Sequence, residues 1–367
     1  MSIGTARQRM VQTGTAGKGM ITVHPAGPRR HLQPLAYPAL ASLFKDAIRL
    51  TENGDAAEII LYAHPRDLWN DRVRLFDWLK RRPDTRIVLL SEEPFWDTVG
   101  LISPFQRQQS LKTPEGPLAF SFLNHHNSRI FDFAHIPYFL LTGHAFYTRY
   151  ARRFSRNRVL SQSDWAWHFA EAPLQAVFMA EHRDNQKQDV DFPQYDIKGL
   201  SVWRTRLAET YQTGAVLRAG KGWPQGSPDR TALRDWHLDK LVQLDRQSRF
   251  VSAIENTHQA NYMSEKVFDA FAVGAVPLYY ASPGHAIHRI LPEGAWLNLY
   301  QTTPAEAGQL IDALTFDAAF LDGYAATQHR LSARFTSPEL LVAERDRLKT
   351  ALITEFQAVL DAGPSIV

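Results

Sequence analysis

The sequence predicts an α/β protein built from two units, each with a parallel sheet covered by helices on both faces. Short apolar runs of strand length alternate with segments of helical period, and this alternation occurs twice along the chain. The length of 367 residues exceeds what one hydrophobic core normally serves, and 44% of the residues are hydrophobic. Since ligands bind beyond the carboxyl ends of parallel strands, we expect a cleft between the units to hold them.

The first unit is predicted from three apolar runs. Strands are expected at 20–24, 57–63 and 86–91, with helices at 38–50 and 67–82. From 92 to 150 the chain is rich in Pro, His and aromatic residues, and few clean periods remain. The chain then becomes basic around 149–158, where we expect the unit to end.

The second unit repeats the alternation. Strands are expected at 174–181, 214–220, 249–254 and 275–281, and helices at 199–211, 233–246, 264–274, 304–332 and 338–361. Polar or Gly/Pro-rich loops are expected at 183–195 and 221–230.

Composition excludes several classes of function. The chain has no cysteine, which excludes disulfides, thiolate metal sites and a cysteine nucleophile. It has no apolar run of about 20 residues that could span a bilayer. The first 20 residues lack the apolar core of a signal peptide, so a cytoplasmic location is expected. The net charge of +3 is too small to predict nucleic-acid binding.

One basic cluster stands out, and two interpretations of it remain open. It contains Arg149, Arg152, Arg153, Arg156 and Arg158. It is either a solvated linker or a peripheral contact with an anionic membrane or a phosphorylated glycolipid.

The most informative segment is 249–283. A buried strand delivers Glu255 and Asn256 at its carboxyl end, and a polar loop then carries Tyr262. Ser264 is a suitable N-cap for the helix that follows, and Gly274 is a suitable stop.

Glu265 and Lys266 fall in the first turn of that predicted helix. A helix N-terminus and a lysine favour an anion such as pyrophosphate, and a carboxylate beside them can accept both hydroxyls of a ribose. The alternative is that both side chains lie at the start of a helix and bind no ligand.

The same segment resembles the donor-binding motif of the α1,3/4-fucosyltransferases, glycosyltransferase family 10. That motif reads R-F-x-x-x-x-E-N-S, four residues, Y-x-T-E-K, a helix and G-x-V-P-V. This chain matches it with Arg249-Phe250, Glu255-Asn256-Thr257, Tyr262, Ser264-Glu265-Lys266, Gly274 and Val276-Pro277. The departures are Thr257 for Ser, Ser264 for Thr, and Ala281-Ser282 where a Gly and a small residue are common.

Three shorter segments resemble the family in the same order. SEEP (91–94) is similar to its E-S-P segment, which makes Glu92 the candidate general base, with Glu93 as the fallback. Residues 122–138 are similar to its F-N-W…D…V-P-Y stretch. Residues 203–222 are similar to the helix and strand of its phosphate-binding arginine, for which Arg204 fits best and Arg206 is the alternative. Glu92 and Glu93 cannot face the same substrate, because adjacent side chains of an extended segment point opposite ways.

The resemblance implies a GT-B-like fold of two Rossmann-like domains with an interdomain cleft. An acceptor-binding domain would cover 1–155 and a sugar-nucleotide-binding domain 156–335, while a C-terminal helix at 336–367 would pack back on the first domain. The implied reaction is an inverting transfer of L-fucose from GDP-L-fucose to a hydroxyl of an acceptor oligosaccharide or glycolipid, such as a bacterial lipopolysaccharide, at the cytoplasmic side of the membrane.

The resemblance also implies a role for each matched residue. Glu92 would be the base, Arg204 and Lys266 would neutralise the leaving diphosphate, and Glu265 would hold the ribose. Asn256 and Tyr262 would shape the donor pocket, which Glu255 would brace or complete. No cofactor and no metal are implied.

Other features carry less weight. Asp189 and Asp191 form a DxD, but polar flanks suggest a solvated loop rather than a metal site. No zinc-helix spacing is found among the four histidines His125, His126, His135 and His144. They either line the acceptor side of the cleft or are ordinary core and surface residues.

Two alternative functions remain open. One is transfer from another sugar nucleotide, and the other is a non-catalytic basic protein that binds nucleic acid or anionic glycans.

Overall fold

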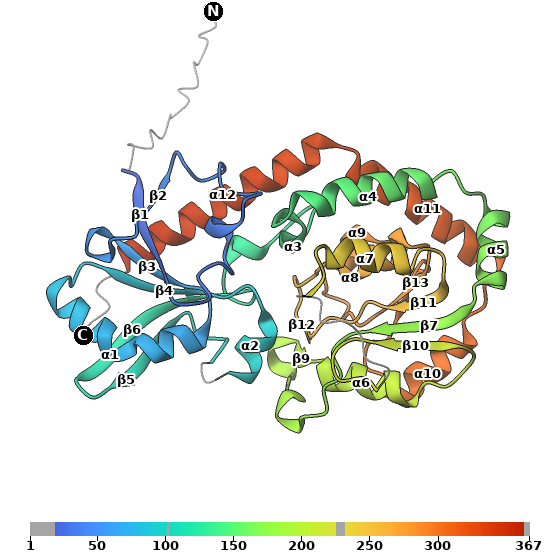
Figure 1. Cartoon of the computed structure of the whole chain (residues 1–367), viewed down its shortest axis with the longest axis horizontal. Helices are drawn as coiled ribbons and strands as arrows, with labels where there is room; N and C mark the ends of the chain where they lie inside the picture. The colour runs from blue at the N-terminus through green and yellow to red at the C-terminus, as the bar shows by residue number, and fades with distance from the viewer. Residues whose placement is uncertain (1–18, 101–102, 225–231, 363–367) are drawn as a thin grey trace, which may run out of the picture.

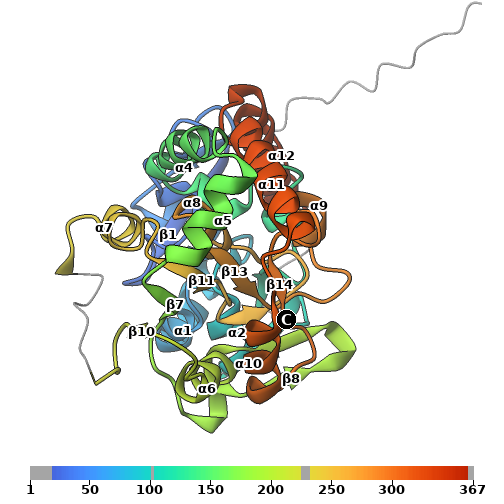
Figure 2. The same cartoon turned by 90° about the vertical axis from the view of Figure 1, so that its right-hand side faces the viewer.

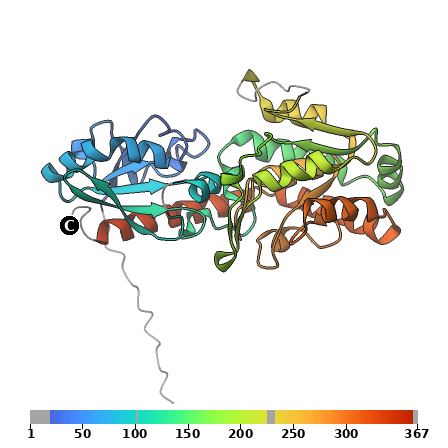
Figure 3. The same cartoon turned by 90° about the horizontal axis from the view of Figure 1, so that it is seen from below.

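Two parallel sheets, each covered by helices, form the two lobes of the protein. The computed structural model describes residues 19–100, 103–224 and 232–362. Seen from the front and from below, the lobes lie side by side and are joined over a narrow region (Figures 1 and 3). The predicted fold class, α/β with two parallel sheets, is confirmed. The predicted domain boundaries stay a prediction.

The first sheet has the strand order β2-β1-β3-β4-β6-β5. All neighbours run parallel except β5, which pairs antiparallel with β6 at the edge. The strands are β1 (Ile21–Ala26), β2 (Ile48–Leu50), β3 (Ile59–Tyr62), β4 (Arg86–Leu90), β5 (Gln108–Thr113) and β6 (Gly116–Leu123). The strands predicted at 20–24, 57–63 and 86–91 are confirmed.

Both faces of this sheet are buried, as the continuous apolar runs indicate. Along β3, Ile59 and Leu61 join one apolar cluster while Ile60 and Tyr62 join another, because successive strand residues point to opposite faces. Helix α1 (Pro65–Arg81) covers one face and α12 (Pro338–Asp361) covers the other. Figure 1 shows α12 running back over this lobe from the far side of the molecule. Short helices complete the lobe: η1 (Pro34–Ala36), η2 (Gly54–Ala56), α2 (Pro94–Val99), η3 (Arg129–Phe131) and α3 (Tyr138–Leu141).

The helix predicted at 38–50 is wrong. That segment forms turns and ends in β2, which pairs with β1. Its apolar residues Leu40, Phe44 and Ile48 are buried, so the helical spacing reflects core packing and not a helix. Pairing with an existing strand outweighs a local preference of a few tenths of a kcal/mol per residue.

The second sheet has the order β10-β7-β11-β13-β14 and is parallel throughout. Its strands are β7 (Leu174–Met179), β10 (Val216–Ala219), β11 (Ser248–Ser252), β13 (Val276–Tyr279) and β14 (Leu297–Asn298). Figure 2 shows α6 (Ser201–Thr210) and α10 (Pro304–Ala313) on one side of the sheet, and α4 (His144–Asn157), α5 (Gln162–Glu171) and α11 (Ala318–Phe335) on the other. Helices α7 (Trp236–Gln243), α8 (Lys266–Ala272) and α9 (Ile287–Ile290) complete the lobe.

A small antiparallel sheet, β12-β9-β8, lies beside it and was not predicted. It consists of β8 (Asp191–Phe192), β9 (Ile197–Gly199) and β12 (Thr257–His258), with η4 (Gln186–Gln188) and η5 (Pro193–Tyr195) in the connection. The remaining strand predictions for this lobe are confirmed, while the helix expected at 304–332 is divided between α10 and α11. The first 18 residues and most of the predicted Gly/Pro loop at 221–230 lie outside the described residues.

The basic segment 149–158 is part of helix α4 and its C-cap, not a linker. Arg149 forms an ion pair with Asp235, and both Arg153 and Arg156 pair with Asp245. These ion pairs tie α4 to the region around α7, so three of the five arginines have an internal role. No helix in the described residues is long and apolar enough to cross a bilayer.

Candidate functional site

The carboxyl ends of the two sheets face each other across the lobes. Glu92 and Glu93 follow β4, whereas Glu255 and Asn256 follow β11. The Asn256 side-chain amide donates to Glu93 Oε1 at 3.3 Å, and the Tyr262 hydroxyl donates to the same oxygen at 3.4 Å. In the second sheet β7 lies between β10 and β11, so the strand order reverses there, and such a switch point is where open α/β sheets bind ligands.

A buried charged cluster lies at this edge of the second sheet. Glu255 Oε1 accepts hydrogen bonds from the Ser264 backbone N–H at 2.8 Å and from its hydroxyl at 2.7 Å. Lys266 Nζ donates to Glu255 Oε2 at 2.9 Å and to Ser264 Oγ at 2.8 Å. An ammonium has three N–H donors, so one remains for another acceptor.

Lys266 stays charged in this cluster. Burial alone would lower its pKa, but the carboxylates of Glu255 and Glu265 outweigh burial and raise the pKa of Lys266 to about 12. Its side chain keeps 20% exposure, against 3% for Glu255. The ammonium is therefore a fixed positive charge with limited access to the cleft.

The helix after this cluster begins two residues later than predicted. Helix α8 starts at Lys266 with Glu265 as its N-cap, and Ser264 bonds to Glu255 instead of capping the helix. Since α8 has only seven residues, the positive charge here comes mainly from Lys266 and not from a long helix dipole. Gly274 adopts a φ of 84° just after the helix, which confirms the predicted stop.

Glu265 lies beside Lys266, with 3.6 Å between its Oε1 and the ammonium. Burial raises the pKa of the Glu265 carboxyl, but the charges of Lys266 and Lys240 outweigh burial and hold it below its usual value. Glu265 is therefore ionised and can accept hydroxyl hydrogen bonds.

The two candidate arginines of α6 point to different places. Arg204 is buried, and its Nη1 donates to the Ile254 carbonyl at 3.0 Å while its Nε has no hydrogen-bond partner among the described residues. Burial and the charge of Arg183 lower the pKa of Arg204 to about 10, so it remains charged at neutral pH. Arg206 is exposed and contacts Asp189 at 3.3 Å. Positions two apart on a helix lie about 200° from each other, which explains the difference.

Arg183 is a third cation that the sequence reasoning missed. It lies four residues beyond β7, and its guanidinium stacks 4.1 Å over the ring of Phe95 in the other lobe. Its Nη2 donates to Glu181 at 2.7 Å, while its Nη1 is buried without a hydrogen-bond partner in the described part of the chain. A systematic search of the residues just beyond each strand would have found it.

Glu92 points away from Glu93, towards two tyrosines. The Tyr37 hydroxyl donates to Glu92 Oε2 at 2.6 Å, and the Tyr138 hydroxyl donates to Oε1. Burial raises the pKa of Glu92 to about 7, although these two hydrogen bonds oppose the rise. A carboxylate with a pKa near neutrality can take a proton and release it again.

His125 lies between the two halves of the site. Its Nε2 is 3.2 Å from the Glu92 backbone carbonyl, and its ring meets Tyr262 edge-on at 4.9 Å. Burial lowers the pKa of His125 to about 3, so the ring is neutral. Of the four histidines considered, His125 is thus in contact with both the Glu92 segment and the donor motif.

The DxD carboxylates are engaged with cations. Asp189 contacts Arg206, and Asp191 pairs with Lys198. Among the residues that the structure describes, no group of three or more His, Asp or Glu side chains could hold a metal ion. Independence from metal stays a prediction.

Two facing α/β lobes hold one buried and two half-buried cations, and a carboxyl group whose pKa is near neutrality. This is an architecture suited to transferring a group from an anionic donor. Residues 227–337 match the family model described as "Glycosyltransferase family 10 (fucosyltransferase) C-term". This part of the chain is similar to that family, which confirms the resemblance read from the motif and the glycosyltransferase class.

Solved structures give a more distant likeness. An α1,3-fucosyltransferase aligns at 11% identity and a TM-score of 0.42, over 88% of this chain and 84% of that one. The same kind of enzyme with GDP-fucose aligns at 11% identity and 0.37, over 97% and 94%. A UDP-forming α,α-trehalose-phosphate synthase from Burkholderia vietnamiensis aligns at 9% and 0.30, over 93% and 70%. No curated protein sequence matches the chain.

Proposed function

We propose that the protein transfers L-fucose from GDP-L-fucose to a hydroxyl of an acceptor glycan, with inversion at the sugar carbon. The observation that carries the proposal is the charged Lys266 with its remaining ammonium donor, inside the segment that matches the fucosyltransferase family. The structures of related enzymes are too distant to add to it.

Lys266 and Arg204 would act on the leaving GDP. As the sugar–phosphate bond breaks, negative charge grows on the diphosphate, and fixed positive charges in a shielded site stabilise it. The buried Nε of Arg204 and Nη1 of Arg183 have no protein partner in the described residues, so both are suitable donors to phosphate oxygens. Glu265 would accept the ribose hydroxyls, while Asn256 and Tyr262 would shape the pocket around the sugar.

Glu92 would be the general base. A single displacement with inversion needs a group that takes the proton of the attacking hydroxyl. The carboxylate accepts one hydrogen bond on each oxygen, and each oxygen has a second lone pair for the acceptor hydroxyl. Tyr37 and Tyr138 would hold the carboxylate in place. Glu93, which contacts Asn256 and Tyr262, is the fallback.

The finer features of the reaction are part of the same proposal. We infer that the acceptor is an oligosaccharide or glycolipid such as bacterial lipopolysaccharide, modified at the cytoplasmic side of the membrane. Two arginines of the basic segment, Arg152 and Arg158, are exposed and would supply the peripheral contact with anionic lipid.

A thermal-shift panel of GDP, UDP and ADP, each with and without its sugar, tests the donor. We expect selective stabilisation by GDP and GDP-fucose, since ligand that binds only the folded state raises the melting temperature. Selective stabilisation by UDP or ADP would indicate another sugar nucleotide. Stabilisation by none of them would favour a non-catalytic protein.

The Glu92→Gln and Glu93→Gln pair tests the base. Glu92→Gln should lower turnover by about 10²–10⁴-fold and leave GDP affinity unchanged, because the base touches the acceptor and not the nucleotide. Glu93→Gln is the control. If Glu93→Gln alone gives slow transfer with intact GDP binding, the base is one residue later.

A further inference from the structure

A cavity of about 650 Å³ lies in the second lobe, and the Lys266 cluster does not line it. Its walls are formed by residues of the connection 189–198, of α6, of β12 and of the segments that follow β13 and β14. Its volume lies within the range of about 300–1,000 Å³ that is usual for small-molecule sites. The proposed donor and base residues do not line it.

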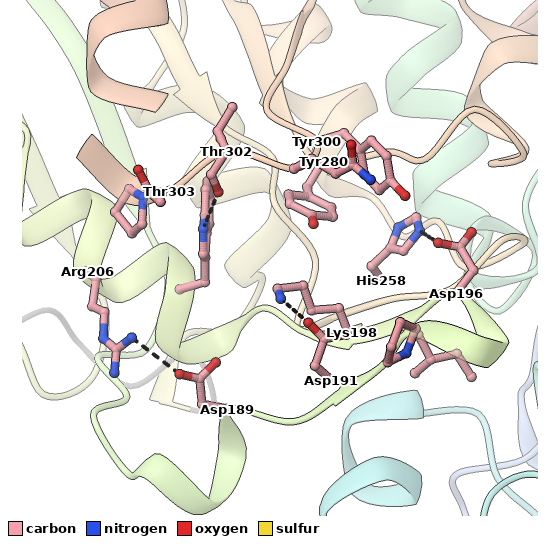
Figure 4. Close-up of a pocket in the computed structure, with 15 residues that line it drawn as sticks. Asp189, Asp191, Asp196, Lys198, Arg206, His258, Tyr280, Tyr300, Thr302 and Thr303 are labelled. Atoms are coloured by element: carbon pink, nitrogen blue, oxygen red, sulfur yellow. Dashed lines mark hydrogen bonds and ion pairs between the residues drawn. The ribbon is translucent and has the colours of Figure 1, made fainter. Parts of the chain in front are cut away.

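The walls of this cavity differ in chemistry (Figure 4). The rings of Tyr280 and Tyr300 lie on one side, and the ion pair of Lys198 with Asp191 lies on the other. The pair of Arg206 with Asp189 borders one end. A sugar ring has this same division, with a C–H face that packs on aromatic rings and edge hydroxyls that bond to carboxylates and cations.

His258 is a buried polar side chain that could bond to a ligand in this cavity. Its side chain lines the cavity and is only 2% exposed, yet neither ring nitrogen has a hydrogen-bond partner of normal geometry in the described residues. Its Nε2 lies 3.3 Å from Asp196, and the Tyr280 backbone is also near the ring, but neither contact has the geometry of a good hydrogen bond. Since a buried polar group without a partner costs about 1–3 kcal/mol, a hydroxyl ligand that bonds to the ring would recover that cost.

The charges favour a neutral ligand. Three aspartates, one lysine and one arginine line the cavity, which leaves one excess negative charge. Burial lowers the pKa of His258, so the ring does not offset that charge. An anionic ligand such as a nucleotide would be repelled, whereas a polyhydroxyl ligand is not.

We propose that this cavity binds neutral pyranose residues of the acceptor glycan, at a distance from the hydroxyl that reacts. The connection that forms its wall also contacts the other lobe, where Tyr195 stacks on Phe105 at 3.8 Å and meets His126 at 5.3 Å. His126 adjoins His125, which contacts the Glu92 carbonyl. A glycan lying along this wall would extend towards the proposed base. That the bound sugar belongs to the acceptor rests on the proposed function, whereas the binding of sugar in this cavity does not.

The test uses the full chain, fluorescently labelled, on a printed array of neutral and acidic oligosaccharides. The wild type should bind a set of neutral glycans, and Tyr300→Ala and Asp191→Asn should each weaken that binding by roughly tenfold or more. Asp46→Asn is the matched control, because Asp46 forms a similar exposed pair with Lys349 on the other lobe. Circular dichroism melting and GDP titration check that each variant is folded.

Two results would overturn the inference: neutral glycan binding that survives in both cavity variants, or no neutral glycan bound by the wild type. The failure of the proposed function looks different. In that case GDP is not bound and no fucose is transferred, while glycan binding by the wild type still depends on Tyr300 and Asp191.

Discussion

Removing one hydroxyl beside Glu92 should change the pH at which this carboxylate ionises. Tyr37 and Tyr138 each donate a hydrogen bond to it, and hydrogen bonds to the ionised form lower a carboxyl pKa. Tyr138→Phe removes one donor and keeps the ring. A hydrogen bond to a charged group contributes about 1.5–3 kcal/mol, and 1.36 kcal/mol corresponds to one pH unit. The pKa of Glu92, about 7 in the wild type, should therefore rise by roughly one to two pH units.

The sign of the effect on catalysis follows from the role of the group. A base acts when it is unprotonated, so a higher pKa moves the acidic limb of the kcat/KM profile to higher pH. NMR titration of protein labelled at the glutamate carboxyl carbon measures the same pKa without any turnover, using Glu92→Gln to assign the signal. Tyr324→Phe is the matched control, because this buried hydroxyl donates to the Ala275 carbonyl far from the carboxylate.

An unchanged Glu92 titration in both Tyr37→Phe and Tyr138→Phe would refute this reasoning. It would mean that burial alone sets the pKa and that the tyrosines do not position the base. A shifted titration together with an unshifted kcat/KM profile would separate the two ideas, since Glu92 would then be held by the tyrosines without being the base.

Four further predictions concern the donor site and the fold. Lys266→Ala should weaken leaving-group stabilisation by about 2.7–4 kcal/mol, seen as a loss of roughly 10²–10³-fold in kcat, and normal turnover with unchanged GDP affinity would exclude its role. Isothermal titration with GDP should show a larger loss for Arg204→Ala than for Arg206→Ala, and the reverse order would shift the motif alignment by two residues. Transfer should survive EDTA, whereas activity lost on chelation and restored by manganese would assign a metal to the DxD pair. Gly220→Ala should lower the free energy of unfolding by about 1–3 kcal/mol in a urea titration. The reason is that Gly220 has a φ of 126° and an added Cβ would lie 2.3 Å from the Ala180 carbonyl oxygen. A variant as stable as the wild type would contradict this.

The sequence determined those parts of the protein that depend on local pattern. Apolar runs such as 57–63 and 86–91 predict buried strands in a sheet covered on both faces, and the structure has them so. The unbroken spacing from Glu255 to Lys266 indicated the family that residues 227–337 match, because binding one ligand at the end of one strand fixes both the residue types and the distance between them. The opposite directions of Glu92 and Glu93 also followed from strand geometry alone.

Only the tertiary structure decided what surrounds these residues. Tyr37 and Tyr138 reach Glu92 from 55 and 46 residues away, and Arg183 meets Phe95 from the other lobe. Three arginines of α4, which look like part of a free basic patch in the sequence, form ion pairs with Asp235 or Asp245. Charge balance and burial in the site result from contacts between segments that are distant along the chain. No local pattern records those contacts, because each partner residue is compatible with many other folds.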